Sequence, residues 1–242
     1  MRKFLTAILS TALVTSAPTL VAAAALQVSP VSLDIPAPSA AATIKLRNVG
    51  TAPINAQIRV FKWIQENGEE KLEPTNDVVA SPPVATLTAG TDYTVRLVRT
   101  SKEPLTSGGT YRLLVDELPD PTRAKNGTIT MVLRYSIPVF FYPVDVTRPK
   151  VTWSFTQRGG RWYVSATNNG GRHVRLSSLK LQGAHGPGIS YGDGLVGYVL
   201  GNSTKSWPIA NGKTLGLGAT VAITAQSDAG PISASAIMQS AR

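Results

Sequence analysis

Side chains capable of covalent chemistry are scarce in this chain of 242 residues. It contains no cysteine, which excludes a thiol nucleophile, a disulfide scaffold and a cysteine-ligated metal site. His173 and His185 are the only histidines, so a serine–histidine–aspartate triad would have to use one of them. We find no carboxylate pair with a partner positioned for acid–base catalysis. We therefore expect no metal site and no cofactor, and we expect His173 to be a surface or strand histidine.

One motif suggests a nucleotide site. Residues 192–197 read G-D-G-L-V-G and match the glycine pattern of dinucleotide-binding proteins. That pattern binds a pyrophosphate only where a strand precedes it and a helix follows it. The surrounding sequence is rich in glycine and has no helical period, so we expect a flexible loop there.

The N-terminus has the pattern of a secretory signal. Arg2 and Lys3 precede an apolar stretch that ends in four alanines, residues 22–25. We expect residues 1–25 to be a cleaved signal peptide, with the cut near Ala24 or Ala25. The formal net charge is +10, and removing the signal takes away two positive charges. An exported basic protein rarely meets nucleic acid, so acidic proteins or an anionic membrane surface are the expected partners.

The remainder alternates apolar and polar residues with a period of two, which is typical of strands. Short strands separated by glycine and proline turns favour an all-β fold of immunoglobulin-like sandwiches. Two prolines bracket a polar stretch at residues 143–149, and a new strand begins after it. We expect two domains, 26–145 and 146–242. The strands expected in the first domain are 28–33, 43–48, 54–64, 91–98, 110–117 and 129–141.

The expected strand 129–141 is apolar on both faces. Ile129, Met131 and Leu133 continue one of them. A fully buried central strand would explain this composition. However, Pro138 cannot donate a backbone hydrogen bond and favours an edge strand or a bulge. An apolar edge strand is an aggregation hazard, and a protein that keeps one can use it to pair with another chain.

Several segments together resemble a known family. They are the opening LQVSPVSLDI, the segments TAPINAQIRVFKWIQENGEEKLEPT and SPPVATLTAGTDYTVRL, the strands YRLLVDELP and RYSIPVFFYP, and NNGGRHVRLSSLKL in the second half. In order and spacing the chain resembles the PapD-like periplasmic chaperones of pilus assembly, and most closely the branch that serves archaic, spore-coat-U-like pili.

The resemblance implies two immunoglobulin-like domains in a boomerang arrangement, located in the periplasm. Such chaperones bind pilin subunits that lack a strand, complement them with their own last strand of the first domain, and release them at an outer-membrane usher. Ile129, Met131 and Leu133 align with the residues that enter the pilin groove. The resemblance implies a protein that is not an enzyme, since no covalent bond changes, and it implies neither a nucleic acid nor a small-molecule substrate. A homodimer that caps the free strand is left open.

The resemblance also implies a basic anchor for the C-terminal carboxylate of the pilin. The family's usual arginine and lysine align with Ser32 and Pro138, which are not basic, and Tyr142 stands where an interdomain arginine is usual. Arg112 and Arg134, on neighbouring strands, are the expected anchors, because guanidinium groups bind carboxylates by charge-assisted hydrogen bonds. The alternative is that one or both are solvated strand arginines.

Two other functions compete with this interpretation. A structural pilus subunit or adhesin would normally be one incomplete sandwich with an N-terminal donor peptide. An exported β-sandwich enzyme or sugar-binding module would need acidic residues and aromatic platforms in loops. Of the four tryptophans, we expect only Trp207 to lie in a loop.

Overall fold

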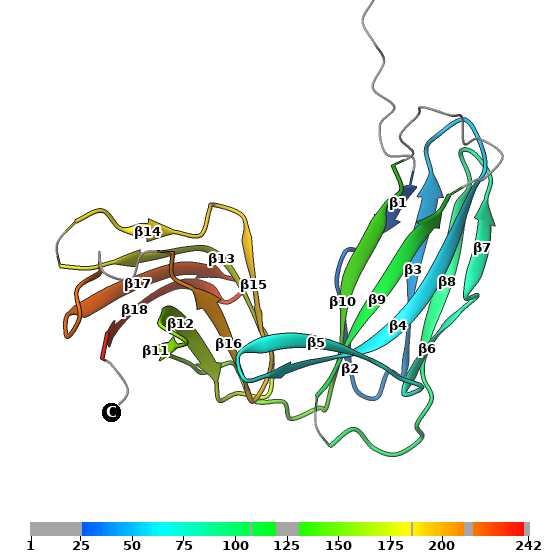
Figure 1. The fold of residues 1–242 in the computed structure, drawn as a ribbon. Coiled ribbons are helices and arrows are strands. Elements are labelled where there is room, and N and C mark those ends of the chain that lie inside the picture. The colour runs from blue at the N-terminus through cyan, green and yellow to red at the C-terminus, as the bar shows by residue number, and fades with distance from the viewer. Residues whose placement is uncertain (1–25, 107, 120–130, 185, 211–214, 240–242) are drawn as a thin grey trace, which may run out of the picture.

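A computed structural model describes residues 26–106, 108–119, 131–184, 186–210 and 215–239. Figure 1 shows two lobes of β-sheet that meet at an angle, with strands β1–β10 in one lobe and β11–β18 in the other. The prediction of two immunoglobulin-like sandwiches in a boomerang arrangement is confirmed. Within the described ranges no helix is long and apolar enough to cross a membrane.

Two sheets form the first domain, and all their strand pairs are antiparallel except β2 with β10. One has the order β1-β3-β8-β6, and the other has the order β2-β10-β9-β4-β5, with β7 also paired to β4. The strands are β1 (Leu26–Ser29), β2 (Leu33–Pro36), β3 (Ala41–Asn48), β4 (Ile54–Glu66), β5 (Glu69–Pro74), β6 (Val78–Ser81), β7 (Val84–Leu87), β8 (Asp92–Arg99), β9 (Gly109–Leu118) and β10 (Arg134–Tyr142).

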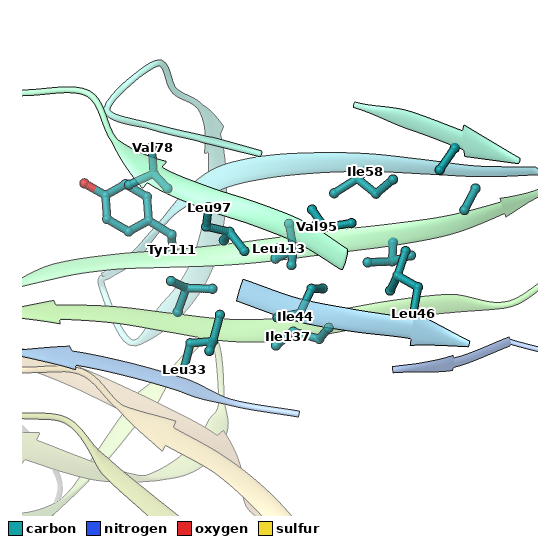
Figure 2. Close-up of a cluster of buried hydrophobic side chains, with 14 of the residues drawn as sticks. Leu33, Ile44, Leu46, Ile58, Val78, Val95, Leu97, Tyr111, Leu113 and Ile137 are labelled. Atoms are coloured by element: carbon teal, nitrogen blue, oxygen red, sulfur yellow. The ribbon is translucent and has the colours of Figure 1, made fainter. Parts of the chain in front are cut away.

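The core of this domain lies between the two sheets. Alternate residues of strands such as β3 and β8 point inward, as in Ile44 and Leu46 of β3, which are both fully buried. Figure 2 shows these side chains interdigitating with those of the facing sheet, including Leu113 and Ile137. The period-two pattern of the sequence therefore corresponds to the buried face of these strands.

The second domain repeats this plan with a three-stranded and a five-stranded sheet. Their orders are β11-β12-β16 and β14-β13-β17-β18, with β15 also paired to β13. The strands are β11 (Val151–Arg158), β12 (Arg161–Asn168), β13 (Val174–Gln182), β14 (Ile189–Ser190), β15 (Leu195–Val199), β16 (Ser203–Pro208), β17 (Thr220–Ser227) and β18 (Gly230–Ile237).

Four local predictions fail. Residues 30–32 separate β1 from β2, so the strand expected at 28–33 is divided in two. Trp207 lies in β16 and packs into the second core, because the polar sequence around it pairs with β12. The loop expected over residues 192–197 is wrong for its second half, because residues 195–197 belong to strand β15. As expected, the glycine motif lacks the helix that a dinucleotide site needs. The expected strand 129–141 starts only at Arg134. Residues 131–133 are described but are not strand, and 129–130 lie outside the described residues.

A buried asparagine ends a strand in each domain and makes the same turn. Asn48 and Asn168 are both fully buried. Each side-chain oxygen accepts a hydrogen bond from the backbone nitrogen two residues on, at 2.9 Å from Gly50 and 3.0 Å from Gly170. Each side-chain nitrogen donates over 2.8 Å to the carbonyl four residues on. The local sequences N-V-G and N-N-G thus mark equivalent corners of the two domains.

Replacing Asn168 with alanine should destabilise the second domain. The substitution removes the partners of several backbone groups, among them the carbonyl of Leu200 and the amide of Gly170. A buried polar group left unpaired costs about 1–3 kcal/mol, so we expect the free energy of unfolding to fall by about that amount or more. Urea unfolding measures it, with the exposed neighbour variant Asn169→Ala as control. Equal stability of the two variants would contradict the structural role.

Candidate functional site at the interdomain cleft and the β10 edge

The sheet face opposite the first core is turned towards the second domain. An interdomain cluster of buried side chains lies where the two domains meet, and it consists of Trp63, Phe140, Tyr142, Tyr198 and Leu200. The ring of Trp63 meets that of Tyr198 edge to face, with centroids 5.5 Å apart. This packing gives the two lobes a shared apolar contact and forms the wall of the cleft.

Arg112 lies on this wall. Its Cζ sits 3.7 Å from the ring centroid of Trp63 and 5.5 Å from that of Tyr198, which is cation–π geometry. Its Nη1 donates to the carbonyl of Ser136 over 3.4 Å. Burial lowers the pKa of Arg112, although an arginine keeps its charge. Among the described residues no carboxylate forms an ion pair with it, so this partly desolvated cation has capacity for an anion.

Arg134 is in a different environment. Its Nε donates to Asp116, and Arg59 Nη2 donates to the other oxygen of the same carboxylate over 2.6 Å. Burial pushes the pKa of Asp116 upward, but hydrogen bonds from Arg134 and Arg59 outweigh it, and the pKa lies below its ordinary value. The side chain of Arg134 is still 62% exposed. It can therefore contact a partner while it remains bound to Asp116.

The two predicted anchors do not share one position. Arg112 is opposite Pro138 in the pairing of β9 and β10. Arg134 is the first residue of β10 and lies four residues before Pro138. At about 3.3 Å per residue, the two backbones are roughly 13 Å apart along the strand. Ser32 lies just before β2, and Tyr142 belongs to the interdomain cluster.

His173 is neither a surface nor a strand histidine, and that expectation is wrong. It is 5% exposed, lies between the domains, and stacks on Phe140 with ring centroids 3.7 Å apart. The hydroxyl of Tyr142 contacts its Nδ1, and Asp228 Oδ2 lies 3.9 Å from its Nε2. Burial raises the pKa of Tyr142, so its hydroxyl stays protonated, and the tautomer of the imidazole decides which of the two groups donates the hydrogen bond.

The hairpin between β4 and β5 ties the domains together on the other side of the cleft. Figure 1 shows it extending from the first lobe towards β16. The amide of Ser206 donates to the carbonyl of Gly68 over 2.9 Å, and Arg158 Nη1 donates to the carbonyl of Asn67 over 2.8 Å. Gly68 has a φ of 82°, and a Cβ there would clash with Ser206. A glycine is therefore required where the hairpin meets the second domain.

The outer edge of β10 is only partly covered. Strand β2 pairs with it over residues 139–142, in parallel. Over residues 134–138 no described strand occupies that side. The carbonyl of Leu133 accepts a bond from Glu117 of β9, whereas that of Tyr142 accepts one from Ala37 beyond β2. Since strand residues alternate, the backbone groups of the even-numbered residues, Arg134 and Ser136 among them, face the uncovered edge.

The predicted donor residues differ in their surroundings. Met131 is 85% exposed and lies three residues before the start of β10. Leu133 is half-buried and packs against the first core. Ile129 lies outside the described residues. An exposed apolar side chain therefore continues directly from an uncovered strand edge, which is the arrangement needed to pair with another chain.

Trp63, Tyr198 and Asp116 are parts of the site that the sequence did not reveal. Trp63 and Asp116 sit on strands that were expected, but the face to which each belongs depends on the strand pairing. Tyr198 comes from the other domain, in a region with weak patterning. Within the described ranges, no group of histidine, aspartate and glutamate side chains could hold a metal ion.

Comparisons with known proteins agree with this architecture. Residues 25–147 match the family described as pili and flagellar-assembly chaperone, PapD N-terminal domain. No curated protein matches the chain. Among solved structures, a chain of the CsuC–CsuE chaperone–tip adhesion subunit pre-assembly complex, from archaic chaperone-usher Csu pili of Acinetobacter baumannii, is 26% identical. Its TM-score is 0.70, and the match covers 90% of this chain and 100% of that one.

Two further structures share the fold. The YadV chaperone is 19% identical with a TM-score of 0.60, covering 87% of this chain and 98% of that one. A chain from the Salmonella enterica SafA pilin–SafB chaperone complex is 16% identical with a TM-score of 0.60. That match covers 88% of this chain and 97% of the other.

The buried imidazole should make stability depend on pH. Burial lowers the pKa of His173 from its ordinary 6.5, and the charge of Arg172 lowers it further. The carboxylates of Asp34 and Asp228 raise it, but the pKa remains below 6.5. As the pH drops below about 6.5, His173 becomes protonated in the unfolded chain but stays neutral in the folded chain. The free energy of unfolding should therefore fall with pH in this range. Melting temperatures between pH 7.5 and 5.5 measure this. His173→Gln should show a shallower decline, and parallel curves would contradict the assignment.

Proposed function

We propose that this chain, which belongs to the PapD-like family of pilus-assembly chaperones, holds a pilin subunit in the periplasm by lending it part of β10 and passes it to an outer-membrane usher. The observation that carries the proposal is the uncovered edge of β10 at residues 134–138, continued by the exposed Met131. A pilin that lacks a strand has unpaired backbone groups and an open apolar groove, and this edge is complementary to both.

The related structures support this choice of partner. The relative from Acinetobacter baumannii belongs to a complex with a tip adhesion subunit, and the one from Salmonella enterica to a complex with a pilin. Family membership also decides against a structural pilus subunit. In the absence of pilin, the same edge could pair with a second copy of the chain, which would cap it.

Within this proposal Ile129, Met131 and Leu133 insert into the pilin groove. Each buried side chain of this size contributes about 1.5–3 kcal/mol, and each net hydrogen bond of the added ladder about 0.5–1.5 kcal/mol. Leu133 also packs against the chaperone's own core, so it is suited to the boundary between the two proteins.

Arg112 and Arg134 form the proposed carboxylate anchor, and their surroundings assign them different weights. Arg112 is partly desolvated and has no ion-pair partner among the described residues, so a terminal carboxylate would give its guanidinium an ion-pair partner. Arg134 already binds Asp116 and would have to share its guanidinium. We therefore assign the carboxylate chiefly to Arg112, with Arg134 as the contact nearer the open edge.

Met131→Glu should abolish pilin capture without changing the stability of the chaperone. The side chain is exposed in the free protein, but on binding the new carboxylate would be buried without a partner, which is costly. Co-expression with candidate pilins encoded beside the gene, followed by pull-down, measures capture, and thermal melting measures stability. Met131→Leu is the control that keeps an apolar group. Full capture by the glutamate variant would refute strand donation at this residue.

The anchor is tested by changing both ends of the contact. A hydrogen bond to a charged group contributes about 1.5–3 kcal/mol, so Arg112→Ala should weaken capture at least tenfold. A pilin extended by several residues past its natural C-terminus lacks the carboxylate at that place. It should bind the wild-type chaperone less tightly but bind Arg112→Ala no worse than the natural pilin does.

Arg161→Ala, an exposed arginine on β12, is the matched control for the loss of charge. Arg134→Ala should weaken capture less than Arg112→Ala does. If the extended pilin loses the same affinity for wild type and for Arg112→Ala, Arg112 does not read the carboxylate.

A further inference from the structure

Gln65 links the two domains through both ends of its side-chain amide. It is 9% exposed and lies near the end of β4, two residues beyond Trp63. Its Nε2 donates to the carbonyl of Tyr198 over 2.8 Å, and its Oε1 accepts from the amide of Leu200 over 3.0 Å. The amide thus pairs with the second domain as the backbone of a neighbouring strand would.

The residue held in this way forms one wall around Arg112. The Tyr198 ring packs edge to face on Trp63, and both rings face the guanidinium of Arg112. Trp63 comes from the first domain and Tyr198 from the second, so the aromatic pair exists only while the domains keep their relative position. Strand β4 carries both Trp63 and Gln65, whose side chain bonds to the backbone of Tyr198.

Phe140 and His173 pack against the ring of Tyr198, whereas Gln65 holds its backbone by hydrogen bonds from the first domain. The tip of the β4–β5 hairpin contacts two strands of the second domain. Gly68 bonds to Ser206 of β16, and Asn67 bonds to Arg158 of β11. Those contacts fix the hairpin to strands other than β15, which carries Tyr198. Gln65 contacts the backbone on both sides of Val199, the last residue of β15, at Tyr198 and Leu200.

We propose that Gln65 is a positioning residue for carboxylate recognition, because it holds Tyr198 against Trp63 and so fixes the guanidinium of Arg112 in the cleft. This inference rests on the proposed function and adds to it a residue that does not itself touch the pilin. A merely structural role would stabilise the domain interface but leave discrimination between natural and extended pilin termini unchanged.

Gln65→Met tests the inference, because methionine has a similar length but neither donates nor accepts as an amide does. The experiment compares capture of a co-expressed candidate pilin with its natural terminus and with the extended terminus. We expect wild type to favour the natural terminus and the variant to lose that preference by about fivefold or more, a typical scale for coupling between two sites. Gln226→Met, an exposed glutamine on β17, should behave like wild type.

Interdomain geometry provides the second readout. Because the chain has no cysteine, Thr43→Cys and Thr224→Cys on exposed faces of the two domains can carry a specific pair of spin labels. In Gln65→Met the distribution of distances between the labels should broaden, while each domain keeps its secondary structure. Gln65→Asn, which keeps an amide but is shorter, should show the same direction and replaces Gln65→Met if that variant fails to fold.

The outcomes separate this inference from the proposed function. If wild type favours the natural terminus and Gln65→Met does so equally, the positioning role is overturned and the anchor stands. A broadened distribution with unchanged preference also overturns it, since Gln65 is then only structural. If wild type shows no preference between the termini, the carboxylate anchor fails, and the role of Gln65 in it fails as well.

Discussion

Backbone hydrogen bonding along the outer edge of β10 is the constraint on which the structure depends. The last part of the strand is covered by the four residues of β2, which seals the sandwich next to the second domain. The earlier part is left uncovered, and Pro138, which has no amide hydrogen, lies at the border between the two. One strand therefore serves the stability of the domain at one end and remains available for pairing at the other.

The cleft follows from the same strand. The side chains of β10 on the odd-numbered side fill the first core, and those on the even-numbered side meet the second domain through Phe140 and Tyr142. His173 completes this contact by stacking on Phe140. The uncovered edge and the guanidinium of Arg112 are consequently held on one rigid sheet, and a partner that engages both would be placed in a defined register.

Much of this fold could be predicted from the sequence, because a sandwich repeats one rule: alternate residues face the core. The start of β10 could not, because residues 131–133 have the composition of a strand but lie where the sandwich ends. His173 looked like a surface residue among arginines, and its burial depends on a contact with a different domain. The importance of Arg112 was expected from resemblance, whereas its aromatic walls, Trp63 and Tyr198, arise from pairing between distant segments.

The stacking of Arg112 on Trp63 has a consequence for the chemistry of capture. Folding has already removed part of the water from this guanidinium, so an arriving carboxylate displaces less solvent than it would at an exposed arginine. Mobile ions screen a partly buried pair much less than a surface pair. On the proposed function, the affinity of Arg112 for the C-terminal carboxylate of a pilin would thus depend only weakly on ionic strength. A chaperone in a compartment open to the surrounding medium would then bind its pilin similarly at low and at high salt concentration.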